Sequence, residues 1–391
     1  MRILMTVPVP LLRELGVARV PADLAVELRD LGHVVEIFDS TAAFGPNRAS
    51  RLQRLQPLRF AARARDYVRA HAQRFDVVEG TQGDLPFPKE ELRFDGLLVA
   101  RSPGLFSVFD AYDAMARARW PEHRRGTPVG RAAQKWAWRR MVAAYRRSLE
   151  VADLVNVPNE AEHAYVRDVL GRGERALLMP LGLRDVDAAA LSAAAGPPAQ
   201  RLAAPHVAFV GSWSLRKGLA DWPEIVARTR ALLPDVRFSF LGTVDSPEDI
   251  LGELGVPGAP WITVVPHFRS EELPALLGSA TVGALPSYAE AWGLGVLEQL
   301  AAGMPVVAYD IPGPRDMLSR LDPTLLVPCG DAGAFAERLV EVLQLEPPAY
   351  GALSQRSRGL AAEFRWSEIA AKTAAVYASA LEELKASRSP M

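Results

Sequence analysis

The stretch Ser287 to Asp310 reads SYAEAWGLGVLEQLAAGMPVVAYD. Its two glutamates, Glu290 and Glu298, lie on either side of the glycine-bearing segment GLG, and the apolar run PVVAY follows. A loop, a helix and a buried strand in this order are typical of a doubly wound α/β sheet. The first turn of such a helix has unpaired N–H groups and a positive dipole end, and glycines let an anion approach that backbone closely. The stretch therefore predicts an anion-binding helix start with a carboxylate on each side of it.

The same alternation of strand and helix runs through most of the chain. Short apolar runs alternate with segments whose apolar residues recur at helical spacing, which indicates parallel α/β architecture. A chain of 391 residues exceeds one core, so two Rossmann-like domains are expected. An Ala- and Pro-rich stretch without periodicity predicts a linker between them. The expected parts are residues 1–183, a linker over 184–204, residues 205–365, and an amphipathic C-terminal helix within 366–391.

Composition excludes several classes of protein. No stretch approaches the ~18 uninterrupted apolar residues of a membrane span. The single cysteine, Cys329, excludes an intrachain disulfide and fits a reducing compartment. Six histidines without close ligand spacing give no support to a His-based metal site. The net charge is −1, but residues 1–183 carry 28 Lys and Arg against 22 Asp and Glu, and the remainder carries 17 against 24. The two halves are therefore expected to meet different partners.

The two glutamates suit a sugar nucleotide. Glu298, inside the helix, could accept two hydrogen bonds from a vicinal diol such as ribose, and Glu290 could face the ligand. A solvated helix residue and a loop charge would explain the same pattern. The wider segment PSYAEAWGLGVLEQLAAGMPVVAYDIPGPRDML resembles the donor-binding segment of the retaining glycosyltransferases of family four, the group 1 glycosyltransferases. The matching positions are Glu290, Gly293, Leu294, Glu298, Ala302, Gly303, Pro305 and Val306.

This resemblance implies a fold and further site residues. The family has the GT-B fold, in which two Rossmann-like, doubly wound domains face a cleft and the C-terminal helix crosses back to the first domain. HVAFVGSWSLRKG resembles the family's first strand and loop of the nucleotide domain, with Lys217 as the charge beside the leaving diphosphate. Ser212 stands where the family usually has arginine. Arg216 could replace that missing arginine. However, the side chains of adjacent residues such as Arg216 and Lys217 usually point apart, so we prefer the interpretation of Arg216 as a solvated surface charge. The resemblance also implies donor contacts at Gly211, Gly242, His267, Phe268 and Gly313, although His267 could equally be an ordinary loop histidine.

The first half of the chain matches the family less closely. Only Gly16 is available where a glycine pair normally follows the first strand, and Arg101 stands where histidine is common. These two are the expected acceptor-side or donor-loop residues. The triplet Asp185-Val186-Asp187 resembles the metal-binding motif of another glycosyltransferase fold, but it falls in the predicted linker, far from Lys217 in sequence. No metal and no other cofactor is therefore expected.

Two stretches of the first half are strongly basic. Residues 47–74 hold eight arginines and one acid, and residues 117–147 hold ten Lys and Arg, one acid and several aromatics. Such helices can lie on an anionic membrane, grip a phosphorylated acceptor, or be solvated faces. Nucleic acid is not an expected partner, since no reader module accompanies the charge. The expected location is the cytoplasm, with the inner face of the cytoplasmic membrane as an alternative.

The expected function follows from the resemblance. It is transfer of a sugar, with retention, from a nucleotide-diphosphate sugar to a hydroxyl of a glycan, a lipid-linked or a small-molecule acceptor. Lys217 and Glu290 would be catalytic, residues 205–365 would bind the donor, and residues 1–183 would shape the acceptor site. Two alternatives are a binding or scaffolding protein that has lost catalysis, which Ser212 favours, and a different GT-B chemistry such as sugar-nucleotide epimerisation or phosphorolysis.

Overall fold

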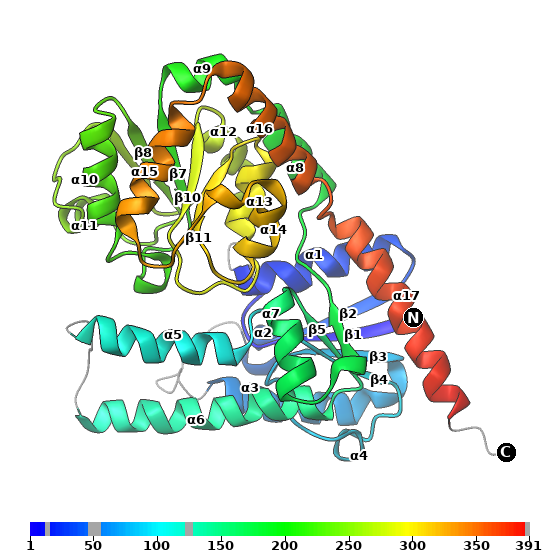
Figure 1. Ribbon diagram of the computed structural model, residues 1–391. Coiled ribbons are helices and arrows are strands. Elements are labelled where there is room, and N and C mark those ends of the chain that lie inside the picture. Colours follow the sequence, from blue (N-terminus) through cyan, green and yellow to red (C-terminus); the bar gives the residue numbers. More distant parts are fainter. Residues whose placement is uncertain (12–15, 46–55, 122–127, 388–391) are drawn as a thin grey trace. The chain divides into compact units, whose positions relative to one another are not determined.

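The chain folds as two compact α/β units. The computed structural model describes residues 1–11, 16–45, 56–121 and 128–387 (Figure 1). The first unit comprises Met1–Leu181 with Trp366–Met391, and the second comprises Gly182–Arg365. Each contains one six-stranded parallel sheet, which confirms the α/β class that the alternation predicts. Within the described ranges, no helix is long and apolar enough to span a bilayer.

The sheet of the first unit has the strand order β2-β1-β3-β4-β5-β6, and all of its neighbouring strands are parallel. Parallel neighbours need crossover connections, and here every connection includes a helix. Strands buried on both faces read as continuous apolar runs, as RILMTV in β1 illustrates. The strands are β1 (Arg2–Val7), β2 (Val34–Asp39), β3 (Val77–Thr81), β4 (Leu97–Arg101), β5 (Leu154–Val157) and β6 (Ala176–Leu178).

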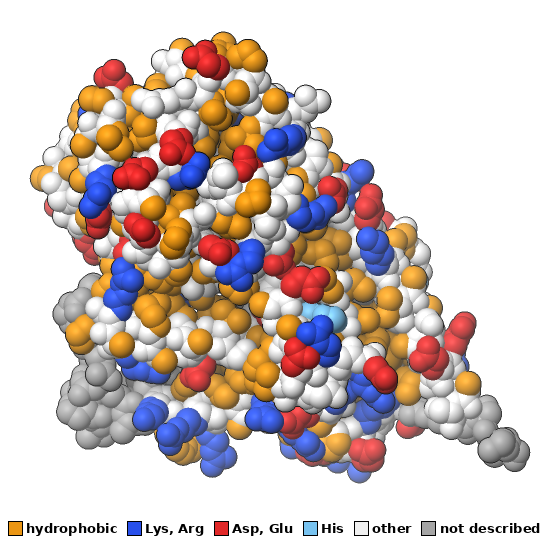
Figure 2. All heavy atoms as spheres, viewed as in Figure 1, with side chains coloured by type: hydrophobic (Ala, Val, Ile, Leu, Met, Phe, Trp, Pro, Cys, Tyr) orange, Lys and Arg blue, Asp and Glu red, His pale blue; other side chains and the backbone are white. Residues whose placement is uncertain are grey.

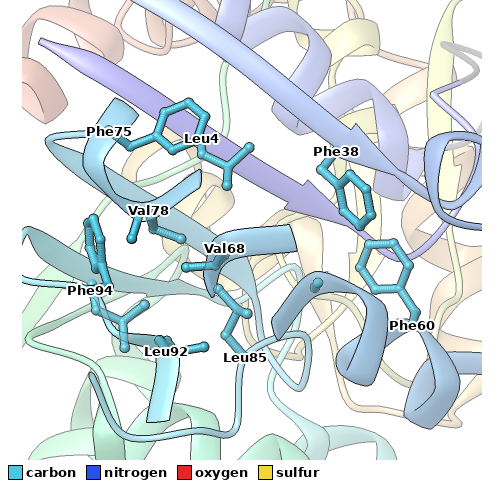
Figure 3. Close-up of a cluster of buried hydrophobic side chains, with 12 residues drawn as sticks. Leu4, Phe38, Phe60, Val68, Phe75, Val78, Leu85, Leu92 and Phe94 are labelled. Carbon is cyan, nitrogen blue, oxygen red and sulfur yellow. The ribbon is translucent and has the colours of Figure 1, made fainter. Parts of the chain in front are cut away.

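Helices cover the faces of the first sheet. The buried cluster drawn in Figure 3 joins Phe60 and Val68 of helix α3 to Leu4 of β1 and Val78 of β3, and the rings of Phe38 and Phe60 stack with centroids 5.8 Å apart. The C-terminal helix α17 packs against α1 and β4 of this unit. The helices are α1 (Gly16–Asp30), α2 (Ser40–Phe44), α3 (Gln56–His71), α4 (Lys89–Leu92), α5 (Phe106–Arg119), α6 (Pro128–Val151), α7 (Glu160–Ala164) and α17 (Trp366–Ala386).

The sheet of the second unit has the order β12-β11-β10-β7-β8-β9, again all parallel. Its strands are β7 (His206–Val210), β8 (Arg237–Leu241), β9 (Ile262–Val265), β10 (Val282–Leu285), β11 (Val306–Tyr309) and β12 (Leu326–Val327). Its helices are α8 (Asp185–Ala193), α9 (Pro198–Ala203), α10 (Trp222–Leu232), α11 (Pro247–Glu253), α12 (Leu273–Leu277), α13 (Leu294–Ala301), α14 (Pro314–Leu321), α15 (Ala332–Leu343) and α16 (Pro347–Ala361).

The stretch expected as a linker, 184–204, is instead part of the second unit. It forms α8, which packs against α12 and α13, and α9, which packs against α16. Arg201 of α9 is 2% exposed and donates to the backbone carbonyls of Gly278 and Gly303. The acidic triplet lies in the first turn of α8, where acids suit the helix dipole, and Asp187 pairs with Arg184 at 2.9 Å. Those contacts give the triplet a helix-stabilising role.

Candidate functional site

The residues predicted to contact the donor gather at one edge of the second sheet. Gly211 follows β7, Gly242 follows β8, Phe268 follows β9, Glu290 follows β10, and Gly313 follows β11. Since all of these strands are parallel, their carboxyl ends lie along the same edge. In open parallel sheets, that edge is where ligands bind.

An ion cluster joins two of these loops. Lys217 ends a single 3₁₀ turn, Leu215–Lys217, and its Nζ lies 2.6 Å from Oε1 of Glu290. Nη1 of Arg216 lies 3.3 Å from the same oxygen and donates to the carbonyl of Ala289 at 2.8 Å. The preference for Arg216 as a solvated surface charge is therefore wrong. The 3₁₀ turn lets two adjacent cations reach one carboxylate.

Burial and charge act against each other on Glu290. Burial favours the neutral acid and raises its pKa, but the charges of Lys217 and Arg216 outweigh this and hold the pKa of Glu290 below its ordinary value. The carboxylate is therefore ionised at neutral pH. The cluster of two cations and one anion carries one net positive charge, which suits an anionic ligand.

Helix α13 begins next to this cluster. Its N-cap is Gly293, with φ of 93°, a left-handed conformation that favours glycine. Glycine offers no side-chain cap bond, and the Val296 N–H donates to the Gly293 carbonyl at 2.9 Å, so the N–H groups of Leu294 and Gly295 are the ones offered to an anion at the positive end of the helix dipole. Glu298 lies four residues after Leu294 and is 5% exposed. Its interpretation as an ordinary solvated helix residue is therefore wrong.

The loop after β11 lies against the loop that precedes α13. A Cβ placed on Gly313 would lie 2.8 Å from the carbonyl oxygen of Ala291, and the φ of Gly313 is 88°. Only glycine fits this approach. A Cβ on Gly293 would lie 3.5 Å from Pro314, and a Cβ on Gly211 would lie 3.5 Å from Cε of Lys217. The structure therefore places the predicted donor-contact residues Gly293 and Gly313 in neighbouring loops, and Gly211 beside Lys217.

Three other residues predicted to contact the donor, Gly242, His267 and Phe268, form a second group at this edge. Gly242 approaches the ring of Phe268, because a Cβ at Gly242 would lie 3.0 Å from that ring. The Gly242 N–H donates to the carbonyl of Val265 at 2.8 Å, so the hydrogen-bonded pairing of β8 with β9 continues into the loop. Phe268 is half-buried and His267 is exposed, so its side chain is open to solvent.

Gly16 and Arg101, the two residues expected on the acceptor side or in the donor loop, lie in the first unit. Gly16 begins α1, and residues 12–15 lie outside the described residues. Arg101 is 6% exposed, and its Nε and Nη2 donate to the two carboxylate oxygens of Glu79 at 2.6 and 3.2 Å. Tyr377 of α17 also donates to Glu79, at 2.5 Å, and lies 3.5 Å from Arg101. Arg101 is thus a neutralised, buried partner that links β3, β4 and α17, although it also lines a small cavity with Thr6.

One buried acid beside the ion cluster has no distinct sequence signal. Asp221 precedes helix α10, where an acid usually caps the helix, yet its side chain makes no such cap bond. Instead, its Oδ2 accepts hydrogen bonds from the hydroxyls of Tyr288 and Tyr309, at 2.5 and 2.7 Å. These partners lie 67 and 88 positions away along the chain, so no local pattern points to them.

Comparison with known sequences shows what the second unit resembles. Residues 204–345 match the family model described as "Glycosyl transferases group 1". The D-inositol 3-phosphate glycosyltransferase of Mycolicibacterium smegmatis is 33% identical over 188 residues, which cover 46% of this chain and 41% of that relative. The matched segment therefore spans about two fifths of the length of that curated relative.

Solved structures share the fold over nearly the whole chain. Sucrose-phosphate synthase from Thermosynechococcus elongatus matches with a TM-score of 0.73 and 20% identity, over 97% of this chain and 99% of that one. The Anabaena protein HepE, solved in complex with UDP, matches with a TM-score of 0.64 and 18% identity, over 97% and 100% of the two chains. Identities this low show the fold alone, and that fold is GT-B. The segment 204–345 is therefore similar to the group 1 glycosyltransferases, and the fold of the whole chain is shared with solved glycosyltransferase structures.

Proposed function

We propose that the protein is a retaining glycosyltransferase that moves a sugar from a nucleoside diphosphate to an acceptor hydroxyl. The observation that carries the proposal is the pairing of Lys217 and Arg216 with Glu290 beside the uncapped start of α13. The family match of the second unit supports it. So does the shared fold of HepE, which was solved with UDP.

The proposed reaction uses these groups as fixed charges. The bond between the anomeric carbon and the diphosphate oxygen breaks, and the acceptor oxygen forms the new bond on the same face of the sugar. The acceptor proton passes to the departing phosphate oxygen. Lys217, Arg216 and the first N–H groups of α13 stabilise the negative charge that develops on the diphosphate, which preorganised donors do without reorganisation. Glu290 lies against the donor sugar and stabilises its positive charge. The proposal involves no metal ion, because side-chain cations supply the positive charge.

The remaining donor-side residues have proposed binding roles. Glu298 accepts hydrogen bonds from the ribose hydroxyls, while Gly242, His267 and Phe268 border the base. The first unit binds the acceptor. Gly211 and Gly313 let their loops lie close to Lys217 and to the loop before α13, and this close approach brings those groups to the proposed donor site.

Donor binding tests the proposal first. Nucleoside diphosphates and their sugars are screened by thermal shift, since a ligand of the folded state raises apparent stability. Glu298→Gln retains one acceptor oxygen but loses the charge, so binding of the selected nucleotide should weaken about tenfold by calorimetry. Glu337→Gln, on the exposed side of α15, is the matched control and should bind like the wild type.

Product analysis tests the chemistry. Nuclear magnetic resonance of the product formed from the selected donor should show the anomeric configuration of that donor. An inverted product would refute retention, and a donor converted without any acceptor would favour epimerisation. Binding without turnover under any acceptor would favour a scaffolding protein. A chain that binds no nucleoside diphosphate would refute the proposed function itself.

Peripheral contact with an anionic membrane is a second part of the proposal, and helix α6 favours it. Trp136, Arg139, Arg140, Arg146 and Arg147 are spaced three, four and seven residues apart, which places them on one face of that helix. Trp136 is 53% exposed, and the Arg140 guanidinium lies 5.1 Å from its ring centroid. Lys and Arg side chains gather along the lower edge of the first unit, over α6 (Figure 2). A cationic face with an exposed tryptophan suits the interface of an anionic bilayer.

Vesicle sedimentation tests this contact. Arg139→Glu combined with Arg140→Glu should reduce partitioning onto vesicles with anionic lipid at low salt by at least about 25-fold, since each cation near the surface contributes roughly fivefold. The control, Lys372→Glu with Lys385→Glu on α17, changes the net charge equally and should partition like the wild type. Equal partitioning of both double variants, or no preference for anionic over neutral vesicles, would refute the contact.

A further inference from the structure

The proposed centre depends on two loops from different parts of the second unit. Lys217 lies in the loop after β7, and Glu290 lies in the loop after β10. Charged groups act in catalysis only when neighbouring residues hold them close to the productive geometry. The 2.6 Å ion pair between these loops therefore needs other contacts that keep the loops together.

Tyr288 and Asp221 supply such contacts. Tyr288 precedes Glu290 by two residues, and its hydroxyl donates to Oδ2 of Asp221 at 2.5 Å. Asp221 follows Lys217 by four residues, so this bond joins the same two loops as the ion pair. A second bond runs in parallel, because the backbone N–H of Tyr288 donates to the carbonyl of Arg216 at 2.8 Å. The side-chain and backbone bonds thus lie on either side of Lys217 in the sequence.

The environment makes this connection stiff. Asp221 is 6% exposed and Tyr288 is 9% exposed, so water competes little for their hydrogen bond. Both tyrosine hydroxyls donate to the same carboxylate oxygen, so the hydrogen bonds form one small buried network. The backbone of the Lys217 loop turns back on itself as well, since the Asp221 N–H donates to the carbonyl of Gly218 at 2.9 Å.

Tyr309 provides a contrast within the same cluster. Its hydroxyl donates to the same Asp221 oxygen at 2.7 Å. Tyr309 belongs to β11, however, which the parallel pairings with β10 and β12 already fix. Its bond joins Asp221 to the sheet but does not join the two loops to each other.

We propose that Asp221 and Tyr288 form a clamp that positions Lys217 against Glu290. The inference rests on the proposed glycosyltransferase function, because it assigns a role in organising that same centre. Asp221 and Tyr288 act through Lys217 and Glu290, so they are positioning residues. When the clamp is loosened, the ammonium moves away from the carboxylate, and both the diphosphate contact and the charge state of Glu290 change.

Two isosteric variants separate the clamp from a general stabilising role. Tyr288→Phe and Tyr309→Phe each remove one of the two hydroxyls that donate a hydrogen bond to Oδ2 of Asp221. With the donor selected by the screen above, Tyr288→Phe should lower kcat about tenfold, whereas Tyr309→Phe should remain within about twofold of the wild type. The acidic limb of kcat/KM should move to higher pH in Tyr288→Phe alone, because Glu290 loses a cation that holds its pKa low.

Amide hydrogen exchange gives a readout that needs no turnover. In Tyr288→Phe, exchange should become faster in both peptides, 214–221 and 286–292, whereas in Tyr309→Phe the 286–292 peptide should match the wild type. Asp221→Asn should reproduce the pattern of Tyr288→Phe. Equal exchange and equal pH profiles in the two tyrosine variants would overturn the clamp while leaving the glycosyltransferase proposal intact. A wild type without any nucleotide-sugar activity would refute the function, and the exchange pattern would still decide the clamp.

Discussion

Replacing Lys217 with methionine separates the structural from the catalytic part of the ion pair. Methionine keeps the apolar stem but removes the ammonium that lies 2.6 Å from Glu290. Removing one partner of a buried pair typically costs 3–5 kcal/mol, because the remaining charge is left uncompensated. Arg216 stays 3.3 Å from the same oxygen and compensates part of that charge. We therefore expect the free energy of unfolding to fall by about 1–3 kcal/mol.

The pH dependence of this loss has a definite sign. The folded-state pKa of Glu290 lies below its ordinary value of 4.5, so the pair stabilises the folded state above that pH. This stability is lost as the pH falls through the folded-state pKa. In Lys217→Met, burial is opposed by one cation fewer, so the folded-state pKa of Glu290 rises. The acid-induced loss of stability should then begin at a higher pH than in the wild type.

Urea unfolding of four proteins provides the assay. They are the wild type, Lys217→Met, Glu290→Gln and the double variant, and their free energies of unfolding form a double-mutant cycle. The double variant should regain stability relative to Lys217→Met, because no buried carboxylate is left unpaired. Turnover should fall about 10²- to 10³-fold in Lys217→Met and should not recover in the double variant. A coupling energy near zero, or wild-type turnover in Lys217→Met, would refute the reasoning.

Two further predictions concern stability. Gly218→Ala should destabilise the second unit by roughly 1–3 kcal/mol in urea unfolding, because its φ is 85° and the new Cβ would lie 2.3 Å from the carbonyl oxygen of Pro286. Gly252→Ala, which has open space around its Cβ, is the control and should not destabilise. Tyr377→Phe should cost about 1–3 kcal/mol and should speed amide exchange in α17, because it removes the buried hydrogen bond to Glu79. Unchanged exchange in α17 would show that this bond does not anchor the helix.

The sequence alone predicts most of the sheet structure, because parallel strands buried on both faces leave continuous apolar runs. The runs RILMTV and HVAFV, for example, correspond to β1 and β7. The sequence predicts the linker wrongly for a related reason. In an alanine-rich helix such as α8, large apolar residues are too few to give a clear helical periodicity in the sequence. Only its packing against α12 and α13 shows that α8 belongs to the second unit.

For the candidate site, too, the sequence predicts the local features and the tertiary structure decides the contacts. The order of residues from Glu290 to Glu298 suffices to predict a helix start between two acids, since helix ends and glycine turns are local features. The partners of those acids are not local. Whether Arg216 points to solvent or to Glu290 depends on how the loop after β7 folds against the loop after β10. Asp221 accepts a hydrogen bond from Tyr288 instead of capping helix α10, and this too depends on how the loops after β7 and β10 fold against each other. Sequence therefore determined which charges are present, and tertiary structure decided their partners, because burial brings together residues that the chain itself keeps far apart.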